Sequence, residues 1–404
     1  MKILQLCNKL PYPEKDGGAI AINTLTHSLL DAGCQVKMLA MNTKKHFTDI
    51  DSIPEKFRKD TGLETVLMDT TVKARKALLA LLRGKSYNIS RFYSADFRHK
   101  LESILKAEQY DVIQLEGLYL TPYIRSIRKI TKAPIILRAH NVEWKIWQML
   151  SQEEKKPLKK TYLLSLSKML KAYETKAINK CDGLTVFTQT DKKQFIEMGC
   201  TVPIEVFPFG IALTNYIPAL AAKTPTLFYI GSLDWMPNLH GLEWFLKHVW
   251  NKVHLAYPNA EFHVAGRSMP KTLKKEDYPG VLFHGEIEDA YAFMKEHGVQ
   301  LVPLFAGSGI RIKIIEGMAL QKAIITTSVG IEGIDCVHGQ DAIVANTSGE
   351  FFEAIKSFLD DANYSQQIAS NARKYIETAH NISNITSNLL VFYKQLIPEK
   401  AVVS

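Results

Sequence analysis

Short apolar runs alternate along this chain with stretches in which apolar residues return every three or four positions. The first run covers residues 2–7, a helical pattern follows at 20–30, and a second apolar run covers 35–40. Continuous apolar runs of this length predict strands that are buried on both faces, and the 3.6-residue period predicts amphipathic helices. The order strand, helix, strand predicts an α/β fold built on parallel sheets.

The same order starts a second time in the other half of the chain. The segment 206–218 contains two prolines and a glycine and is typical of a linker, and a new apolar run follows at 226–230. A chain of 404 residues is too long for one ordinary core, and it suits two domains of about 150–200 residues each. We therefore expect a first domain at 1–209, a second domain at 210–385 and a last helical segment at 386–404.

The composition is that of a globular protein without a membrane span. Hydrophobic residues make up 46% of the chain and charged residues 23%. No apolar run approaches the roughly 18–20 residues that span a bilayer, and the first residues lack the pattern of a signal peptide. The five cysteines are dispersed and never form a Cys-x-x-Cys pair. This usage predicts a reducing compartment, and we expect a cytoplasmic protein.

The formal net charge of +9 is concentrated in one stretch. Residues 155–180 contain eight lysines and a single acidic residue, Glu174, with leucines and tyrosines at helical spacing between them. One interpretation is a helix that contacts an anionic surface on the inner face of the cytoplasmic membrane. The other is an ordinary amphipathic helix with a solvated lysine face. We expect no nucleic-acid partner, because no recognition module accompanies the charge.

The segment 306–319 has the strongest chemical pattern. Gly307 and Gly309 separate a short apolar run from a helical pattern at 310–320. The free N–H groups of a helix start can bind an anion, and glycines let the backbone approach it. Arg311 and Lys313 would be unfavourable near the positive end of a lone helix dipole, so they indicate a bound polyanion. The alternative is a packing turn with two solvated cations.

A second candidate site follows the apolar run 134–139. His140 comes directly after this expected strand, and Asn141 and Glu143 follow it. Ligands of open α/β sheets bind at the carboxyl ends of strands, so this position favours a functional histidine over a structural one. The paired glycines Gly17 and Gly18 stand in the corresponding place after the first run, where they are either turn residues or ligand contacts.

These motifs resemble those of a known family. The run Gly-Ser-Gly-x-Arg-x-Lys-x-x-Glu at 307–316 is similar to the donor-nucleotide loop of a subgroup of retaining glycosyltransferases of family 4. The runs at 138–143 and 231–241 are similar to the N-domain active-site motif and to a second donor loop of this subgroup. The resemblance implies a GT-B fold, in which two Rossmann-like, doubly wound domains face a cleft and the C-terminal helix crosses back to the first domain.

The resemblance also implies roles for individual residues. The catalytic residues would be His140 facing the donor sugar, Arg311 at the leaving diphosphate and Glu316 at the ribose hydroxyls. Asn141 and Glu143 would orient the sugar or contact the acceptor. Donor contacts are implied for Gly17, Gly18, Gly231, Ser232, Arg267, Gly285, Glu286, Gly307, Ser308, Gly309, Ile310 and Lys313.

The chain departs from the commoner family pattern at two points. In the loop that corresponds to 231–241, many members have Gly-Arg with a lysine a few residues later, where this chain has Ser232 and no lysine before Lys247. The first glutamate of the usual Glu-x7-Glu motif is replaced by Ser308. We expect Arg311 and Lys313 to neutralise the phosphates instead.

We expect a retaining glycosyltransferase that moves a sugar from a UDP- or GDP-linked donor to a hydroxyl of a glycan or lipid-linked acceptor. The setting would be the synthesis of bacterial surface polysaccharide or glycoconjugate. Neither a metal nor another cofactor is expected, since no His/Cys cluster has the spacing of metal ligands. Two alternatives are a non-catalytic GT-B subunit that binds a partner transferase or a membrane, and a GT-B sugar-nucleotide epimerase.

Overall fold

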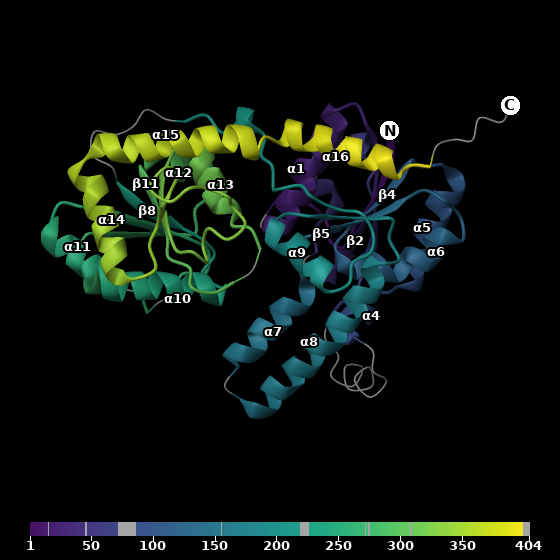
Figure 1. Cartoon of the computed structure of the whole chain (residues 1–404), viewed down its shortest axis with the longest axis horizontal. Helices are drawn as coiled ribbons and strands as arrows, with labels where there is room; N and C mark the ends of the chain where they lie inside the picture. Colours follow the sequence, from purple (N-terminus) through teal and green to yellow (C-terminus); the bar gives the residue numbers. More distant parts are fainter. Residues whose placement is uncertain are drawn as a thin grey trace. The chain divides into compact units, whose positions relative to one another are not determined.

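The chain forms two compact α/β units (Figure 1). Unit 1 comprises Met1–Gly210 and Ile382–Ser404, and unit 2 comprises Ile211–Asn381. The chain re-enters unit 1 earlier than the predicted boundary at 385/386, because Ile382 and Ile385 are already buried there against Gly210. The computed structural model describes residues 1–14, 16–44, 47–71, 86–154, 156–218, 226–270, 272–273, 275–307 and 309–398.

Unit 1 is built on a seven-stranded parallel sheet with the order β3-β2-β1-β4-β5-β6-β7. The order reverses between β1 and β4, which is the switch point of a doubly wound sheet. The structure confirms the predicted α/β class and the first strand–helix–strand unit. The strands are β1 (Lys2–Cys7), β2 (Gln35–Thr43), β3 (Glu64–Met68), β4 (Val112–Glu116), β5 (Ile135–Ala139), β6 (Gly183–Val186) and β7 (Ile204–Val206).

Helices cover both faces of this sheet. Alternate residues of β1 point to opposite sides, so Leu4 and Leu6 join one core cluster and Ile3 joins another. The first cluster contains apolar residues of α5 (Ala95–Ala107), α6 (Ile124–Arg128) and α9 (Gln189–Glu197). The second contains those of α1 (Gly17–Asp31) and α16 (Ile382–Leu396), which lie side by side. Shorter helices are α2 (Glu55–Asp60) and α4 (Tyr87–Ser90), and the pair α7 (Glu143–Glu153) and α8 (Pro157–Ile178) forms a hairpin.

Unit 2 repeats the strand order of unit 1. Its six parallel strands run β10-β9-β8-β11-β12-β13, with the switch point between β8 and β11. They are β8 (Leu227–Ile230), β9 (Phe262–Ala265), β10 (Val281–Gly285), β11 (Val299–Val302), β12 (Ala323–Thr326) and β13 (Ile343–Val344). The helices are α10 (Met236–Phe245), α11 (Asn251–Ala256), α12 (Ala290–Glu296), α13 (Ile312–Ala319), α14 (Ser348–Asp360) and α15 (Ala362–Ala379).

Two helices differ from the sequence expectation. α13 begins at Ile312 with Arg311 as its N-cap residue, so the expected helix at 310–320 is shorter at both ends. The lysine-rich helix begins at Pro157, whose ring suits a first helical turn. In the part of the chain that the structure describes, no helix is both long enough and apolar enough to cross a membrane.

Candidate functional site

In each unit the candidate residues lie at the carboxyl edge of the sheet, most of them around its switch point. In unit 1 they follow β1 and β5, which flank β4. In unit 2 they follow β8 and β11, with Arg267 after β9 and with Gly285 and Glu286 at the end of β10. At such a point neighbouring strands send their connections to opposite faces, and this leaves room for a ligand at the carboxyl edge. The two sites are described separately below.

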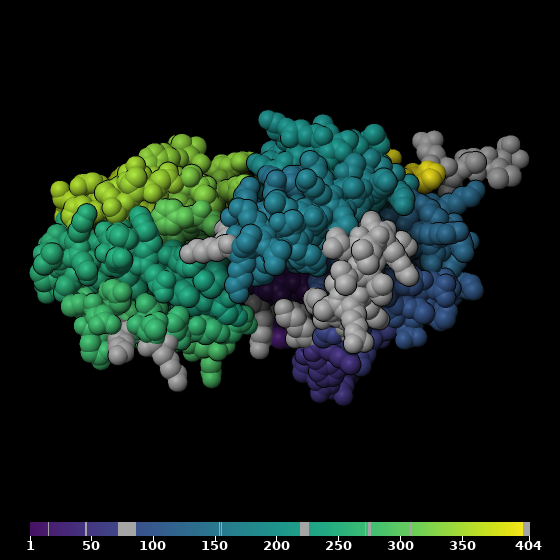
Figure 2. Space-filling view, turned by 90° about the horizontal axis from the view of Figure 1, so that it is seen from below, coloured from purple at the N-terminus to yellow at the C-terminus, as the bar shows by residue number. Residues whose placement is uncertain are grey.

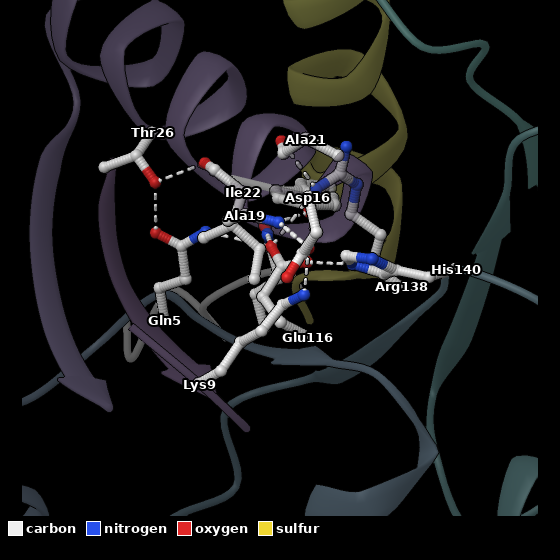
Figure 3. A network of polar contacts seen from close by, with 12 residues as sticks. Gln5, Lys9, Asp16, Ala19, Ala21, Ile22, Thr26, Glu116, Arg138 and His140 are labelled. Carbon is white, nitrogen blue, oxygen red and sulfur yellow. Dashed lines mark hydrogen bonds and ion pairs between the residues drawn. The ribbon is translucent and has the colours of Figure 1, made fainter. Parts of the chain in front are cut away.

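Glu116 is the centre of the polar network in unit 1. Its carboxylate is fully buried at the end of β4. Gln5 Nε2 donates a hydrogen bond to Glu116 at 2.9 Å, His140 Nε2 lies 2.6 Å away, and Arg138 Nη1 lies 3.1 Å away. Gln114 donates a fourth bond. Figure 3 shows Glu116, Arg138 and His140 converging beside the start of α1.

These contacts fix the protonation of both partners. Burial raises the pKa of Glu116, but the Arg138 charge and the hydrogen bond from His140 outweigh it and bring this pKa to about 2. An ionised carboxylate only accepts hydrogen bonds, so the proton of His140 sits on Nε2. Burial lowers the pKa of His140, although Glu116 opposes the shift. The imidazole is therefore neutral at pH 7, and Nδ1 keeps a lone pair for a hydroxyl group.

Two helices support this network from the same face of the sheet. Thr26 of α1 donates a hydrogen bond to Gln5 Oε1 at 2.8 Å. Tyr393 of α16 donates one to Gln114 Oε1, and this bond joins residues 279 positions apart. Each glutamine then uses its amide N–H to bind Glu116. The orientation of His140 thus depends on side chains from the first and last helices of the unit.

Gly17 and Gly18 form the first turn of α1. Asp16 caps the helix by accepting a hydrogen bond from Ala19 N at 2.9 Å, and it also pairs with Lys9. A Cβ atom at Gly18 would lie 2.6 Å from Lys9 Nζ. Glycine at this position therefore leaves space for the Lys9 ammonium group. The implied contact of these glycines with the donor stays a prediction.

Asn141 and Glu143 lie on the loop that carries His140 into α7. Asn141 is half-buried in a bend, and Glu143 is the first residue of α7. Tyr119 Oη donates a hydrogen bond to Glu143 Oε2 at 2.7 Å, and burial raises the pKa of Glu143. Glu174 of α8 caps α7 by accepting from the N–H groups of Glu143 at 3.1 Å and Trp144 at 3.2 Å. These contacts fix the end of the loop at the start of α7, and the contact of His140 with Glu116 fixes its beginning.

In unit 2 the ammonium group of Lys313 reaches the loop after β8. Its Nζ donates hydrogen bonds to Ile230 O at 3.2 Å and Asn238 Oδ1 at 3.0 Å, and it lies 4.8 Å from the Tyr229 ring centroid. A Cβ atom at Gly231 would be 3.0 Å from this Nζ. Burial lowers the pKa of Lys313 to about 7, and the Arg311 charge adds to the shift.

Arg311 lies at the start of α13 beside the glycine-rich turn. It is 6% exposed, it donates a hydrogen bond to Gly309 O, and its guanidinium lies 5.9 Å from the Trp235 ring centroid. Gly307 has a φ of +124°, and a Cβ atom there would lie 2.8 Å from the Trp235 ring. Both its backbone angle and its close approach to Trp235 thus require glycine at this position.

The loops after β8, β9 and β10 are joined by polar contacts. Ser232 Oγ donates a hydrogen bond to Asp234 at 2.5 Å, and Arg267 Nη2 lies 3.2 Å from the same carboxylate. Gly266 N donates to Gly285 O at 2.7 Å, and the exposed Glu286 follows. Ser232 and Arg267 are therefore brought together through Asp234, which the sequence did not single out.

Three further predicted residues lie along the 307–316 run. Glu316 is on α13 and accepts a hydrogen bond from Tyr216 Oη at 3.0 Å. Ile310 is half-buried in the loop before this helix. Ser308 lies outside the described residues.

The sequence interpretation missed Glu116, the two glutamines, Tyr393 and Trp235. One signal was present for three of them: Gln5, Gln114 and Glu116 are polar residues inside otherwise apolar strand segments. Asn238 lies within the run 231–241 but was not predicted as a site residue, and it binds both the Lys313 ammonium group and the Ser232 carbonyl. The loop after β8 lacks a cation of its own, and Lys313 supplies one from α13.

Comparison with solved structures shows the fold. The sucrose-phosphate synthase of Thermosynechococcus elongatus is similar over 98% of this chain and 99% of its own, with a TM-score of 0.71 and 16% identity. HepE of Anabaena, solved in complex with UDP, is similar over 98% and 100%, with a TM-score of 0.67 and 15% identity. TarM is similar over 97% and 98%, with a TM-score of 0.70 and 11% identity. These likenesses confirm the predicted GT-B fold with two Rossmann-like domains.

Sequence comparisons agree with this fold. A curated protein of Klebsiella pneumoniae, described as an uncharacterized 44.6 kDa protein in cps region, is 23% identical over 407 residues, which cover 96% of this chain and 98% of that protein. The family model "Glycosyltransferase Family 4" matches residues 15–215, and "Glycosyl transferases group 1" matches residues 224–361. With one match in each unit, the chain is a glycosyltransferase of the family 4 type.

Proposed function

We propose that this glycosyltransferase moves a sugar from a nucleotide-diphosphate sugar to a hydroxyl of a glycan or lipid-linked acceptor, with retention of anomeric configuration. Unit 2 would bind the nucleotide, and unit 1 would contribute His140 and the acceptor contacts. The observation that carries the proposal is the pair of cations, buried Arg311 and half-buried Lys313, beside the glycine-rich loops at the switch point of unit 2.

The cations match the main electrostatic demand of this reaction. Negative charge grows on the diphosphate as the glycosidic bond breaks, and preorganised donors that stabilise it lower the barrier. Arg311 and the N–H groups at the start of α13 would supply such donors, and Lys313 would add a charge beside Gly231. We therefore propose a reaction without a metal ion. Glu316 would accept hydrogen bonds from the ribose hydroxyls.

His140 would act as a neutral group. With its proton held on Nε2 by Glu116, its Nδ1 can accept a hydrogen bond from a hydroxyl of the donor sugar. Asn141 and Glu143 lie on the same loop and would orient the sugar or the acceptor. The acceptor would attack on the face from which the diphosphate leaves, and a phosphate oxygen would take its proton.

The similar proteins support the choice of donor and setting. Structures of Anabaena HepE have been solved with UDP and with UDP-glucose, so a uridine nucleotide is the first donor to test here. The Klebsiella pneumoniae relative is described as lying in a cps region, which supports a role in polysaccharide synthesis. We propose the same biosynthetic setting for this chain.

A thermal-shift screen with UDP, GDP, ADP and CMP tests the donor site. A nucleotide at about 100 times its dissociation constant adds roughly 2.7 kcal/mol to the free energy of unfolding, which gives a clear shift. We expect one uridine or guanosine diphosphate to stabilise the protein. No shift with any of the four would instead support a non-catalytic subunit.

The variant Arg311→Ala then tests whether Arg311 binds the phosphate groups of the nucleotide. The nucleotide found in the screen should bind at least about tenfold more weakly, since a charge-assisted hydrogen bond contributes about 1.5–3 kcal/mol. Arg125→Ala removes an exposed arginine of unit 1 and is the matched control. Affinity of Arg311→Ala within threefold of the control would contradict the proposed role.

Incubation with the matching nucleotide sugar tests the stereochemistry. In the absence of acceptor we expect slow donor hydrolysis, with the anomer of the donor formed first in the NMR spectrum. Hydrolysis should continue when a chelator is present. Inversion of the anomer, or loss of activity in the chelator, would overturn the corresponding part of the proposal.

A further inference from the structure

The helical hairpin of α7 and α8 projects from the sheet of unit 1 (Figure 1) and forms a large part of the face seen in Figure 2. Its base is joined to the unit by the hydroxyl groups of Tyr173 and Thr121, which lie 2.9 Å apart. Its two helices are joined to each other: Glu174, which is 1% exposed, caps the first turn of α7, and Ser167 Oγ donates a hydrogen bond to Trp144 O at 3.0 Å. The hairpin therefore projects as one arm.

Large apolar side chains lie exposed toward the free end of this arm. Leu158 is 88% exposed, more than any other large apolar side chain in the described part of the chain. Leu150 at 44%, Tyr162 at 37% and Leu164 at 37% lie on the same two helices. The interpretation of α8 as an ordinary amphipathic helix with a solvated lysine face does not explain why these apolar side chains are exposed together.

The same helix carries an excess of positive charge. All seven lysines between residues 156 and 180 are exposed, and Glu174, the only acidic residue among them, is buried. Of these lysines, only Lys159 has a carboxylate within ion-pair distance among the described residues, that of Glu154. Two exposed leucines and a tyrosine among lysines that mostly have no carboxylate partner are typical of a helix that lies on an anionic lipid surface.

We propose that the α7–α8 hairpin binds the surface of an anionic phospholipid membrane. The lysines would be attracted to the lipid headgroups, while Leu158 and Tyr162 would enter the boundary with the acyl chains. Lysine is depleted at protein–protein interfaces because it is strongly hydrated and flexible, so its density here favours lipid over a protein partner.

The arm begins next to the candidate site of unit 1. His140 precedes α7 by three residues, and Glu174 fixes the start of that helix. A hairpin bound to lipid would hold this loop close to the membrane. If the proposed transferase function holds, the arrangement selects a lipid-linked acceptor over a free glycan.

Vesicle co-sedimentation of the full chain tests the proposal. We expect binding to vesicles of phosphatidylcholine mixed with phosphatidylglycerol, little binding to phosphatidylcholine alone, and weaker binding at high salt. The triple variant Lys156→Gln/Lys160→Gln/Lys168→Gln should bind roughly 100-fold more weakly, because each lysine contributes about 1 kcal/mol and about 1.4 kcal/mol is tenfold. The control Lys247→Gln/Lys252→Gln/Lys356→Gln makes the same change in charge on exposed residues of unit 2.

A second pair of variants tests the apolar contribution. Leu158→Ser should weaken vesicle binding about fivefold. Leu255→Ser is the matched control, because Leu255 is 81% exposed on α11 and lies outside the hairpin. Both leucines are exposed, so neither change should alter the thermal stability.

Three results would overturn the proposal. Equal binding to the two kinds of vesicle would show that anionic lipid is not required. Equal losses of binding in the two triple variants would show that the hairpin is not the binding surface. If the chain instead self-associates without binding vesicles, and Leu158→Ser abolishes this association, the hairpin binds a second copy of the chain. Nucleotide binding is measured without vesicles, so failure of the donor screen and failure of vesicle binding are distinguishable.

Discussion

The two units share a strand order but hold opposite charges at the same edge of the sheet. Unit 1 buries an acid, Glu116, and surrounds it with four side-chain donors. Unit 2 holds two cations, buried Arg311 and half-buried Lys313, beside glycine-rich loops. The same topology thus supports two kinds of site, and the side chains at the switch point decide which kind.

The pKa values show that the two sites differ in how far the protein itself compensates their charges. The pKa of Glu116 is brought to about 2 by its own protein partners, so its charge is fully compensated within unit 1. The pKa of Lys313 is lowered to about 7 by burial and by Arg311, so its charged form is less favourable than that of an exposed lysine. An anion would relieve that cost. We infer that unit 1 is preorganised without a ligand, whereas unit 2 is completed by one.

The largest expected effect follows from removing the acid of unit 1. Glu116→Gln keeps the shape but leaves Arg138 and His140 facing a neutral amide. Breaking a buried charge pair costs about 3–5 kcal/mol, so we expect a loss of about 3 kcal/mol in the free energy of unfolding at neutral pH. Denaturant unfolding measures it. Glu205→Gln, which breaks the exposed pair with Lys192, is the control and should cost less than about 1 kcal/mol.

The pH dependence of this loss has a definite sign. The pKa of Glu116 is depressed in the folded state, so its contribution is present above the unfolded pKa of about 4.3 and is lost as the pH falls toward about 2. The difference between wild type and Glu116→Gln should therefore narrow in acid. A difference at neutral pH no larger than that of the Glu205 control would contradict the role of Glu116 as the centre of the network.

A smaller effect is expected from titration of the cation in unit 2. Because the pKa of Lys313 is about 7, the fraction of charged ammonium in the free protein falls as the pH rises above this value. The affinity for the nucleotide found in the screen should drop about tenfold between about pH 7 and about pH 8.5. The free energy of unfolding of the free protein should instead increase over this pH range. The lysine of the unfolded chain titrates near 10.4, so the unfolded state binds more protons than the folded state here.

Calorimetry in buffers of different ionisation enthalpy measures the protons taken up on binding. We expect uptake above about pH 7 in the wild type and none in Lys313→Met, whose affinity should be low and independent of pH. Lys247→Met, an exposed lysine of the same unit, should behave as the wild type. Proton uptake that persists in Lys313→Met would assign the titration to another group.

The sequence predicted the architecture better than the chemistry of unit 1. Apolar runs and helical periods are local signals, and they were sufficient for two parallel α/β domains. The glycines and cations at 307–316 also lie within one loop and helix, so their clustering was visible. The Glu116 network joins Gln5 to Glu116 across 111 positions and Gln114 to Tyr393 across 279. No local pattern encodes such partners, because strand order and register decide which polar residues meet.

The smallest effect concerns the contribution of the last helix to unit 1. Tyr393 is fully buried on α16, and its hydroxyl holds the Gln114 amide that binds Glu116. Tyr393→Phe keeps the ring but removes this donor, so we expect a loss of about 1 kcal/mol in the free energy of unfolding. Tyr257→Phe is the control, since that hydroxyl bonds to the exposed Asp360. Nucleotide binding should be unchanged in both variants, because the cations proposed to bind the diphosphate belong to unit 2. A stability loss equal to that of the control would mean that the network of unit 1 holds His140 without support from α16.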